Sequence, residues 1–350
     1  MKPVPPSGVR RILFIRPRFL GDVCLTLPAV DAALAACPGA SAAYVLEAPL
    51  APLLAGDPRF SDVIPVPAKP TPRETVWLIG RLRAFAPDVA FDFFCNPRSA
   101  VWTRASGARV RVGYPNKGWR SALYTHHARP RVLSSTAFHA ASLAALGWPV
   151  PAPLPSPRLA VAASTRAEAR EALRRIDVPD DAMLVGFHPG ARWPTRRWAP
   201  ERFAALAQRV LDEHAGAIVL VTAGPGESEA ARESLALLPP ARARLVEGWP
   251  IARFVALQSF CTAFVCGDTG PLHTAVAAGA PTLGLLSRNR PAMFFPYDEH
   301  QGHRAYTAHV ECSPCDRDEC ADLRCLTRLT VDGAWDRLAP MLASPAAAPR

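Results

Sequence analysis

The turn at residues 16–23 (RPRFLGDV) carries an acid where a helix begins. It follows a buried strand predicted at residues 11–16, and the predicted helix starts at Asp22. Gly21 permits a tight turn, and a carboxylate at the rim of a sheet is well placed to act as a general base. The alternative, which is the commoner role of an aspartate in this position, is that Asp22 only caps the helix.

The loop of residues 188–203 (HPGARWPTRRWAPERF) joins another strand to another helix and concentrates cations. Two adjacent arginines can hold a diphosphate through paired hydrogen bonds, and strand-to-helix loops of α/β proteins face the ligand. The alternative is an exposed basic loop in which Trp198 packs into the core. The candidate ligand-binding residues here are His188, Gly190, Thr195, Arg196 and Arg197.

The turn of residues 266–275 (CGDTGPLHTA) has the composition of an anion site at a helix start. Backbone N–H groups at Thr269 and Gly270 would point at an anion, and the helix dipole would favour its charge. Asp268 is suited to hold a sugar or ribose hydroxyl. His273 follows on the first helical turn, where it either contacts the same ligand or packs as a structural histidine.

The loop of residues 224–227 (GPGE) follows a strand that ends at the same predicted sheet edge. Glu227 has two readings of equal weight. It accepts hydrogen bonds from hydroxyl groups of a donor, or it is an acid in a first helical turn that favours the helix dipole.

Four of the nine cysteines cluster near the end of the chain, at Cys312, Cys315, Cys320 and Cys325. Four thiolates this close in sequence are able to hold a structural zinc ion, although the spacing differs from the paired CxxC units of zinc ribbons. Reduced thiols or a local disulfide are the alternatives. No accompanying histidine or carboxylate motif favours a catalytic metal.

Alternating strands and helices surround these motifs, which predicts parallel βαβ units. Strands are expected at residues 11–16, 42–46, 62–66, 88–93, 183–188, 217–222, 263–266 and 282–286. A proline-rich stretch at residues 148–157 interrupts the alternation, because regular elements tolerate few prolines. The sequence therefore predicts two Rossmann-like α/β domains, residues 1–160 and 161–350, with a ligand cleft between them.

The net charge of +10 favours anionic partners such as nucleotides, phosphorylated sugars or an anionic membrane face. The cations are dispersed along the chain, which argues against nucleic-acid binding. We find no signal-peptide pattern and no apolar run near the ~20 residues of a membrane helix. The expected location is the cytoplasm, with any membrane contact peripheral and at the inner membrane.

Taken together, the motifs resemble glycosyltransferase family 9, the bacterial lipopolysaccharide heptosyltransferases. The resemblance rests on the LGD turn, the HPG…RRW loop, the DTGPLH turn and the CSPC cysteines, in this order from Arg11 to Cys325. It implies the GT-B fold, with acceptor binding by residues 1–160 and nucleotide-sugar binding by residues 161–350. It also implies an inverting transfer that requires no metal or other cofactor.

By this resemblance, Asp22 is the general base, Arg196 replaces a lysine that binds the donor phosphate, and Glu227 lies near the nucleoside. The donor turn corresponds to Asp268, Thr269, Gly270 and His273. On the acceptor side, Arg18 and Gly21 are the candidates. Pro17, Arg18 and Phe19 depart from the small polar residues usual in the family, which changes the acceptor pocket.

The predicted function is transfer of a sugar, heptose from ADP-heptose by family default, onto a lipopolysaccharide-core or related glycolipid. The alternatives are a transferase that uses another donor and a binding protein that holds a nucleotide sugar without turnover. A nicotinamide-dependent oxidoreductase is disfavoured because the GxGxxG fingerprint is missing. A zinc-dependent nucleic-acid module would require stoichiometric zinc and steeply salt-dependent binding.

Overall fold

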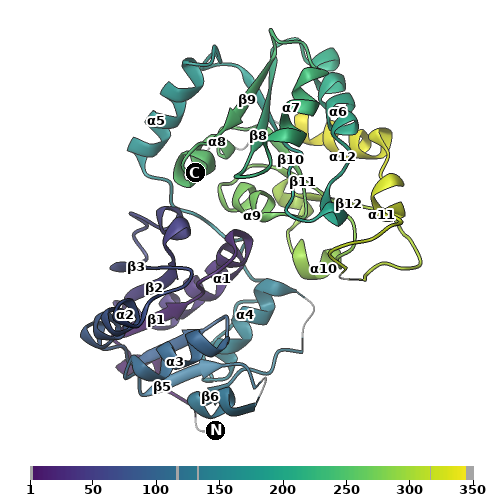
Figure 1. Ribbon diagram of the computed structural model, residues 1–350. Helices are drawn as coiled ribbons and strands as arrows, with labels where there is room; N and C mark the ends of the chain where they lie inside the picture. The colour runs from purple at the N-terminus through teal and green to yellow at the C-terminus, as the bar shows by residue number, and fades with distance from the viewer. Residues whose placement is uncertain (1–2, 116–117, 132–133, 316, 344–350) are drawn as a thin grey trace. The chain divides into compact units, whose positions relative to one another are not determined.

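The chain folds into two compact α/β units, residues 1–160 and 161–350 (Figure 1). The computed structural model describes residues 3–115, 118–131, 134–315 and 317–343. Each unit is built on one six-stranded sheet in which all strands pair in parallel. The predicted α/β class with parallel sheets is confirmed.

The first unit has the strand order β3-β2-β1-β4-β5-β6. Its strands are β1 (Arg11–Ile15), β2 (Ser41–Glu47), β3 (Asp62–Val66), β4 (Val89–Asp92), β5 (Val110–Gly113) and β6 (His126–His127). Its α-helices are α1 (Leu20–Ala36), α2 (Pro72–Phe85), α3 (Pro97–Ala105) and α4 (Ser135–Ala144). Leu13 and Ile15 of β1 share a buried cluster with Leu78 and Leu82 of α2 and with α3, so these helices cover one face of the sheet.

The second unit has the strand order β12-β11-β10-β7-β8-β9. Its strands are β7 (Met183–His188), β8 (Ala217–Ala223), β9 (Ala243–Glu247), β10 (Ala263–Gly267), β11 (Thr282–Leu286) and β12 (Arg304–Thr307). Its α-helices are α5 (Ala163–Arg174), α6 (Pro200–Glu213), α7 (Ser228–Ala236), α8 (Ile251–Gln258), α9 (Gly270–Ala277), α10 (Pro291–Phe294), α11 (Arg324–Thr327) and α12 (Val331–Ala343).

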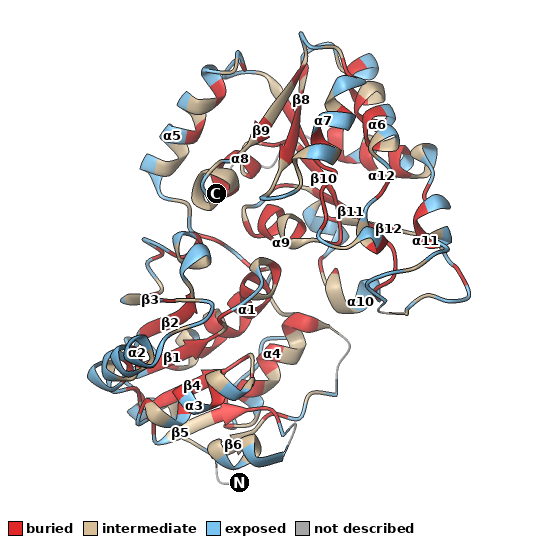
Figure 2. Cartoon of the chain, viewed as in Figure 1, coloured by how far each residue is buried: buried red, intermediate tan, exposed pale blue. Residues whose placement is uncertain are grey.

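The last helices of the chain complete the core of the second unit. Trp198 is buried beside α6, and its indole N–H donates to the Leu329 carbonyl at 2.9 Å. Leu338 of α12 belongs to the same buried cluster, and α12 packs on α6. The strands of both sheets are mostly buried in Figure 2, as expected for parallel sheets with helices on both faces.

Both units share one topology, which predicts where ligands bind. Strand order reverses between β1 and β4 in the first unit and between β7 and β10 in the second. Adjacent crossovers leave in opposite directions at such a switch point, which opens a crevice at the carboxyl ends of the strands. The loops that follow β1, β7 and β10 carry most of the predicted site residues, and Glu227 follows the neighbouring strand β8. Among the described residues, no helix has the length and apolarity needed to cross a membrane.

Candidate functional site

Asp22 lies at the switch point of the first unit and is held by Arg16, a residue the sequence did not single out as functional. Arg16 Nη2 lies 2.7 Å from Asp22 Oδ2, and Arg16 Nη1 donates to the Phe93 carbonyl at the end of β4 (2.9 Å). The same guanidinium packs on the Phe94 ring, 4.8 Å from its centre. The Asp22 side chain keeps 28% of its surface exposed, so the fixed carboxylate remains accessible to a substrate proton.

The interpretation of Asp22 as a helix cap is wrong. The N-cap of α1 is Phe19, which places Asp22 in the first turn of the helix. Phe19 has φ 69°, a left-handed conformation that is uncommon for a bulky residue and is found where surrounding structure imposes it. A carboxylate in the first turn is favoured by the helix dipole.

The acceptor-side candidates occupy the same edge of the first sheet. Arg18 is 45% exposed, and its Nε lies 3.5 Å from Glu47 Oε1 at the end of β2. Arg98 of α3 reaches the same oxygen at 3.6 Å. Gly21 is buried in the first turn of α1. Two arginines that share one carboxylate leave a net positive charge beside Asp22.

In the second unit, Arg196 joins the two predicted donor loops. Its Nη1 donates to the Asp268 carbonyl at 2.9 Å and lies 3.5 Å from Asp268 Oδ2. A Cβ at Gly267 would lie 2.7 Å from the Arg196 carbonyl oxygen, so glycine lets the loops approach this closely. Arg197 is used differently, because its Nε donates to the Ala191 carbonyl of its own loop (2.6 Å).

Asp268 is buried and already engaged by protein groups. Asn289, which follows β11 and was not predicted, donates its side-chain amide to Asp268 Oδ2. Thr269 is the N-cap of α9 but makes no side-chain capping hydrogen bond, and Gly270 is the first residue of that helix. First-turn N–H groups without a side-chain cap are available to an anion, with the helix dipole in support.

Buried His188 and partly buried Glu227 form a pair at the carboxyl end of β7. His188 Nε2 lies 3.0 Å from Glu227 Oε2, His188 Nδ1 lies 2.9 Å from Thr222 Oγ1, and Gly224 N–H donates to Glu227 Oε2 (3.1 Å). Burial alone would raise the pKa of Glu227, but His188, the Gly224 N–H and nearby Arg197 outweigh it and lower the pKa. A Cβ at Gly190 would lie 2.7 Å from Glu227 Cβ, so Gly190 makes room for this carboxylate.

His273 is buried on the first turns of α9. Its Nδ1 lies 2.5 Å from the Tyr297 hydroxyl, another group that sequence reasoning missed. Burial, and the positive charge of Arg196, lower the pKa of His273 to about 3, so the ring is neutral at pH 7. Burial likewise lowers the pKa of His303, whose ring lies 5.8 Å from that of Tyr297, to about 4.

Because the pKa values of these two histidines are lowered, we expect the folded chain to lose stability in mild acid. In the unfolded chain both bind a proton below about pH 6.5, whereas in the folded chain they resist protonation down to about pH 4 and about pH 3. Their contribution to the free energy of unfolding therefore has its full value above pH 6.5. It falls as the pH is lowered, by roughly 2 kcal/mol for each ring at pH 5. Urea unfolding at pH 7 and pH 5 measures it. We expect His303→Gln to reduce the difference and the exposed His300→Gln to leave it unchanged; an equal difference in both variants would contradict the assignment.

Thr195 connects the donor loop to the cysteine-bearing segment. Its hydroxyl lies within hydrogen-bond reach of the Arg317 and Asp318 carbonyls (3.0 and 3.2 Å), and its carbonyl accepts from Ser287 Oγ at 2.6 Å. Arg288 Nη2 pairs with Asp318 at 2.8 Å. The hydroxyl of Thr195 thus positions the loop that carries Arg196.

All nine cysteines are free thiols in the structure. Burial and the neighbouring charges of Cys312, Cys315 and Cys320 raise the pKa of Cys325, so the four thiols share one neighbourhood. In the part of the chain that the structure describes, no three His, Cys, Asp or Glu side chains are arranged to hold a metal ion. The structural zinc at these four cysteines stays a prediction.

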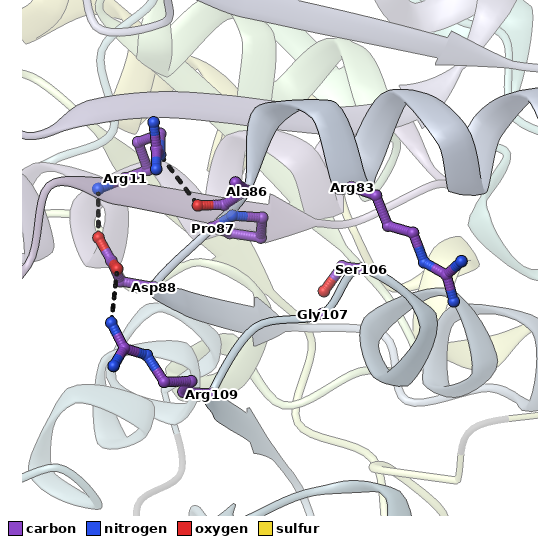
Figure 3. A pocket seen from close by; sticks show the side chains of 8 residues that line it. All are labelled: Arg11, Arg83, Ala86, Pro87, Asp88, Ser106, Gly107 and Arg109. Atoms are coloured by element: carbon purple, nitrogen blue, oxygen red, sulfur yellow. Dashed lines mark hydrogen bonds and ion pairs between the residues drawn. The ribbon is translucent and has the colours of Figure 1, made fainter.

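A cavity of about 400 Å³ lies at the opposite edge of the first sheet (Figure 3). Arg11 begins β1, and Asp88 and Arg109 precede β4 and β5, so the cavity sits at the amino ends of these strands. Arg83, at the end of α2, completes the basic lining. None of the predicted site residues lines this cavity, which is therefore separate from the site at the carboxyl ends.

This chain matches a known protein family. Residues 76–325 match the model of the family described as "Glycosyltransferase family 9 (heptosyltransferase)". Lipopolysaccharide heptosyltransferase 1 of Pseudomonas aeruginosa is 27% identical over 96% of this chain and 99% of its own length.

Solved structures agree on the fold. A family 9 glycosyltransferase from Veillonella parvula matches with a TM-score of 0.83 at 20% identity, over 97% of this chain and 99% of the other. The E. coli heptosyltransferase WaaC with ADP-2-deoxy-2-fluoro heptose matches with a TM-score of 0.70 at 20% identity. The match covers 94% of this chain and 99% of the other. The predicted GT-B class of two Rossmann-like domains is thereby confirmed.

Proposed function

The chain belongs to glycosyltransferase family 9, and we propose that it transfers heptose from ADP-heptose to a lipopolysaccharide-core or related glycolipid with inversion. The observation that best supports the proposal is the contact of Arg196 with the Asp268 turn at the start of α9 (2.9 Å), because a cation beside a helix start favours a bound diphosphate. The proposed locations are the cytoplasm and the surface of the inner membrane.

In the proposed reaction, Asp22 takes the proton of the acceptor hydroxyl. The acceptor oxygen then bonds to the anomeric carbon as the bond from that carbon to the diphosphate breaks. Negative charge grows on the leaving diphosphate, and Arg196 with the first-turn N–H groups of α9 stabilises it. Arg16 keeps the base oriented, since it holds Asp22 against the end of β4.

The donor's nucleoside and sugar have separate partners in this proposal. Glu227 is fixed by His188 and Gly224, keeps 19% of its side chain exposed, and accepts hydrogen bonds from ribose hydroxyls. Neutral His273 contacts the donor through the ring nitrogen that Tyr297 leaves open. The acceptor binds on the first unit beside Arg18 and Gly21. The transfer itself requires no cofactor, and any zinc at the four clustered cysteines is structural.

A donor screen tests the proposal. Thermal unfolding with ADP-, GDP-, UDP- and CMP-sugars should show a midpoint increase on the order of 5 °C for ADP-heptose at ~100 times its Kd. Release of the nucleoside diphosphate with candidate glycolipids then reports turnover. Stabilisation by another nucleotide sugar would correct the donor, and no stabilisation by any of them would contradict the proposed function.

A further inference from the structure

Helix α2 of the first unit exposes an unusual combination of side chains. Seven large hydrophobic side chains are exposed among the described residues, and only Val76 (70%) and Trp77 (51%) are neighbours in the chain. Figure 2 shows much of α2 in the exposed colour. The opposite side of the helix is well anchored, because Leu78 and Leu82 are buried in the core and a Thr71–Glu74 capping box closes the first turn. The exposure is therefore a property of a stable helix.

The charge around these apolar residues is positive. Arg73, Arg81 and Arg83 are exposed on α2, and Lys69 is exposed just before it. The one acid of the helix, Glu74, is occupied by Thr71 N–H and Oγ1 (both 2.7 Å). Arg81 lies over the Trp77 ring, 5.8 Å from its centre, and pairs with Asp62 at 2.5 Å. The surface thus carries four cations, including Lys69, against the two acids Asp62 and Glu74. A tryptophan and a valine flanked by arginines are typical of the outward face of an amphipathic helix that lies in a lipid interface.

The basic surface continues past the end of α2 into the cavity of Figure 3. Arg83 lines that cavity together with Arg11 and Arg109. The carboxylate there, Asp88, accepts from the backbone N–H groups of Arg10 (2.8 Å) and Arg11 (3.0 Å) and also pairs with Arg109 at 3.7 Å. The three arginines make the lining of this cavity basic, although their guanidinium groups do not converge on one point in Figure 3.

The start of α2 lies near the acceptor-side residues of the same unit. Arg98 donates to the Ala68 carbonyl, four residues before α2 begins at Pro72. Arg98 also reaches Glu47, which pairs with Arg18. The surface therefore runs from the edge of the sheet that carries Asp22 along the ~21 Å of α2 to the cavity at the other edge.

We propose that this α2 surface, formed by Val76, Trp77, Arg73, Arg81 and Arg83, docks the protein on a bilayer containing anionic phospholipid. Trp77 and Val76 enter the interface, and the arginines bind lipid phosphates. Charge complementarity selects this partner, since a cationic surface with an amphipathic aromatic ring matches an anionic lipid surface. Docking would bring the protein to its proposed glycolipid acceptor. In this respect the proposal rests on the proposed transferase function.

Sedimentation of the full chain with vesicles tests the docking without turnover. We expect binding to phosphatidylethanolamine and phosphatidylglycerol at roughly 3:1, and little binding to phosphatidylcholine alone. Val76→Ser with Trp77→Ser, and separately Arg73→Gln with Arg83→Gln, should each weaken binding tenfold or more, as expected for the loss of an apolar anchor or of two cations. The matched controls are Leu237→Ser, and Arg175→Gln with Arg232→Gln, on exposed positions of the second unit; both should bind as the wild type does.

Three results would overturn the docking. The first is equal binding to both kinds of vesicle, and the second is equal binding by the α2 variants and the wild type. The third is a dimer that dissociates in the Val76→Ser, Trp77→Ser variant without any vesicle binding, which would assign the surface to a second copy. Donor-induced thermal stabilisation in each variant verifies the fold, and its absence in the wild type would count against the proposed function alone.

Discussion

Replacing Asp22 by asparagine is expected to lower kcat by ~10²–10⁴-fold, the range for loss of a general base. Asparagine has nearly the same shape and can still accept a hydrogen bond from Arg16, which lies 2.7 Å from the carboxylate. It cannot take the acceptor proton. Donor binding, measured by thermal shift, should change little, because the proposed donor residues lie on the second unit.

Asp31→Asn provides the matched control for this variant. Asp31 is on the same helix and also pairs with an arginine, Arg59 at 2.9 Å, but lies outside the site. It should retain turnover. Full activity of Asp22→Asn would end the proposed mechanism. Wild-type protein that binds nucleotide sugars but releases no diphosphate with any acceptor would favour the non-catalytic binding protein.

Replacing Arg196 by alanine is expected to lower kcat on the order of 10²–10³-fold, as for loss of one group that stabilises charge in the transition state. The side chain contacts the Asp268 turn at 2.9 Å, and its charge reaches His273. Arg196→Lys should recover much of the rate, because a lysine keeps the charge on the leaving diphosphate. Steady-state kinetics of diphosphate release measures both variants.

Arg192→Ala is the control on the same loop. Arg192 is exposed and stacks on Trp193, 4.8 Å from the ring centre, so its loss should leave kcat within a few-fold of the wild type. Unfolding curves of all three variants separate chemistry from loop stability. Equal rates for Arg196→Ala and the wild type would remove Arg196 from the leaving-group site.

The strands that the sequence predicts are those with a continuous apolar run. The eight expected strands correspond to β1–β4, β7, β8, β10 and β11. The four it misses, β5, β6, β9 and β12, contain charged or polar residues such as Arg111, His126, Arg244 and Arg304, and β6 has only two residues. Pairing with a neighbouring strand, and not local composition, makes these segments extended.

The site shows the same division between local and distant information. Glycines and turns identify the loops, because their chemistry is local. The partners come from far along the chain: Arg16 reaches Asp22 and the carbonyl of Phe93, 77 residues away, and Asn289 reaches Asp268 across the β10–β11 pair. The capping interpretation of Asp22 fails because Phe19, three residues earlier and at φ 69°, is the N-cap of α1.

The bond between Thr195 and the carbonyls of Arg317 and Asp318 has a consequence for biosynthesis. Thr195 and its partners are more than 120 positions apart, so both must have been synthesised before the loop that carries Arg196 is fixed. Trp198 likewise cannot form its hydrogen bond until Leu329 has been added. A nascent chain on the ribosome therefore lacks the finished loop that carries Arg196 until almost the whole polypeptide has been made. If this loop binds the donor as proposed, premature stop codons even near the 3′ end of the reading frame should leave a product that does not bind it.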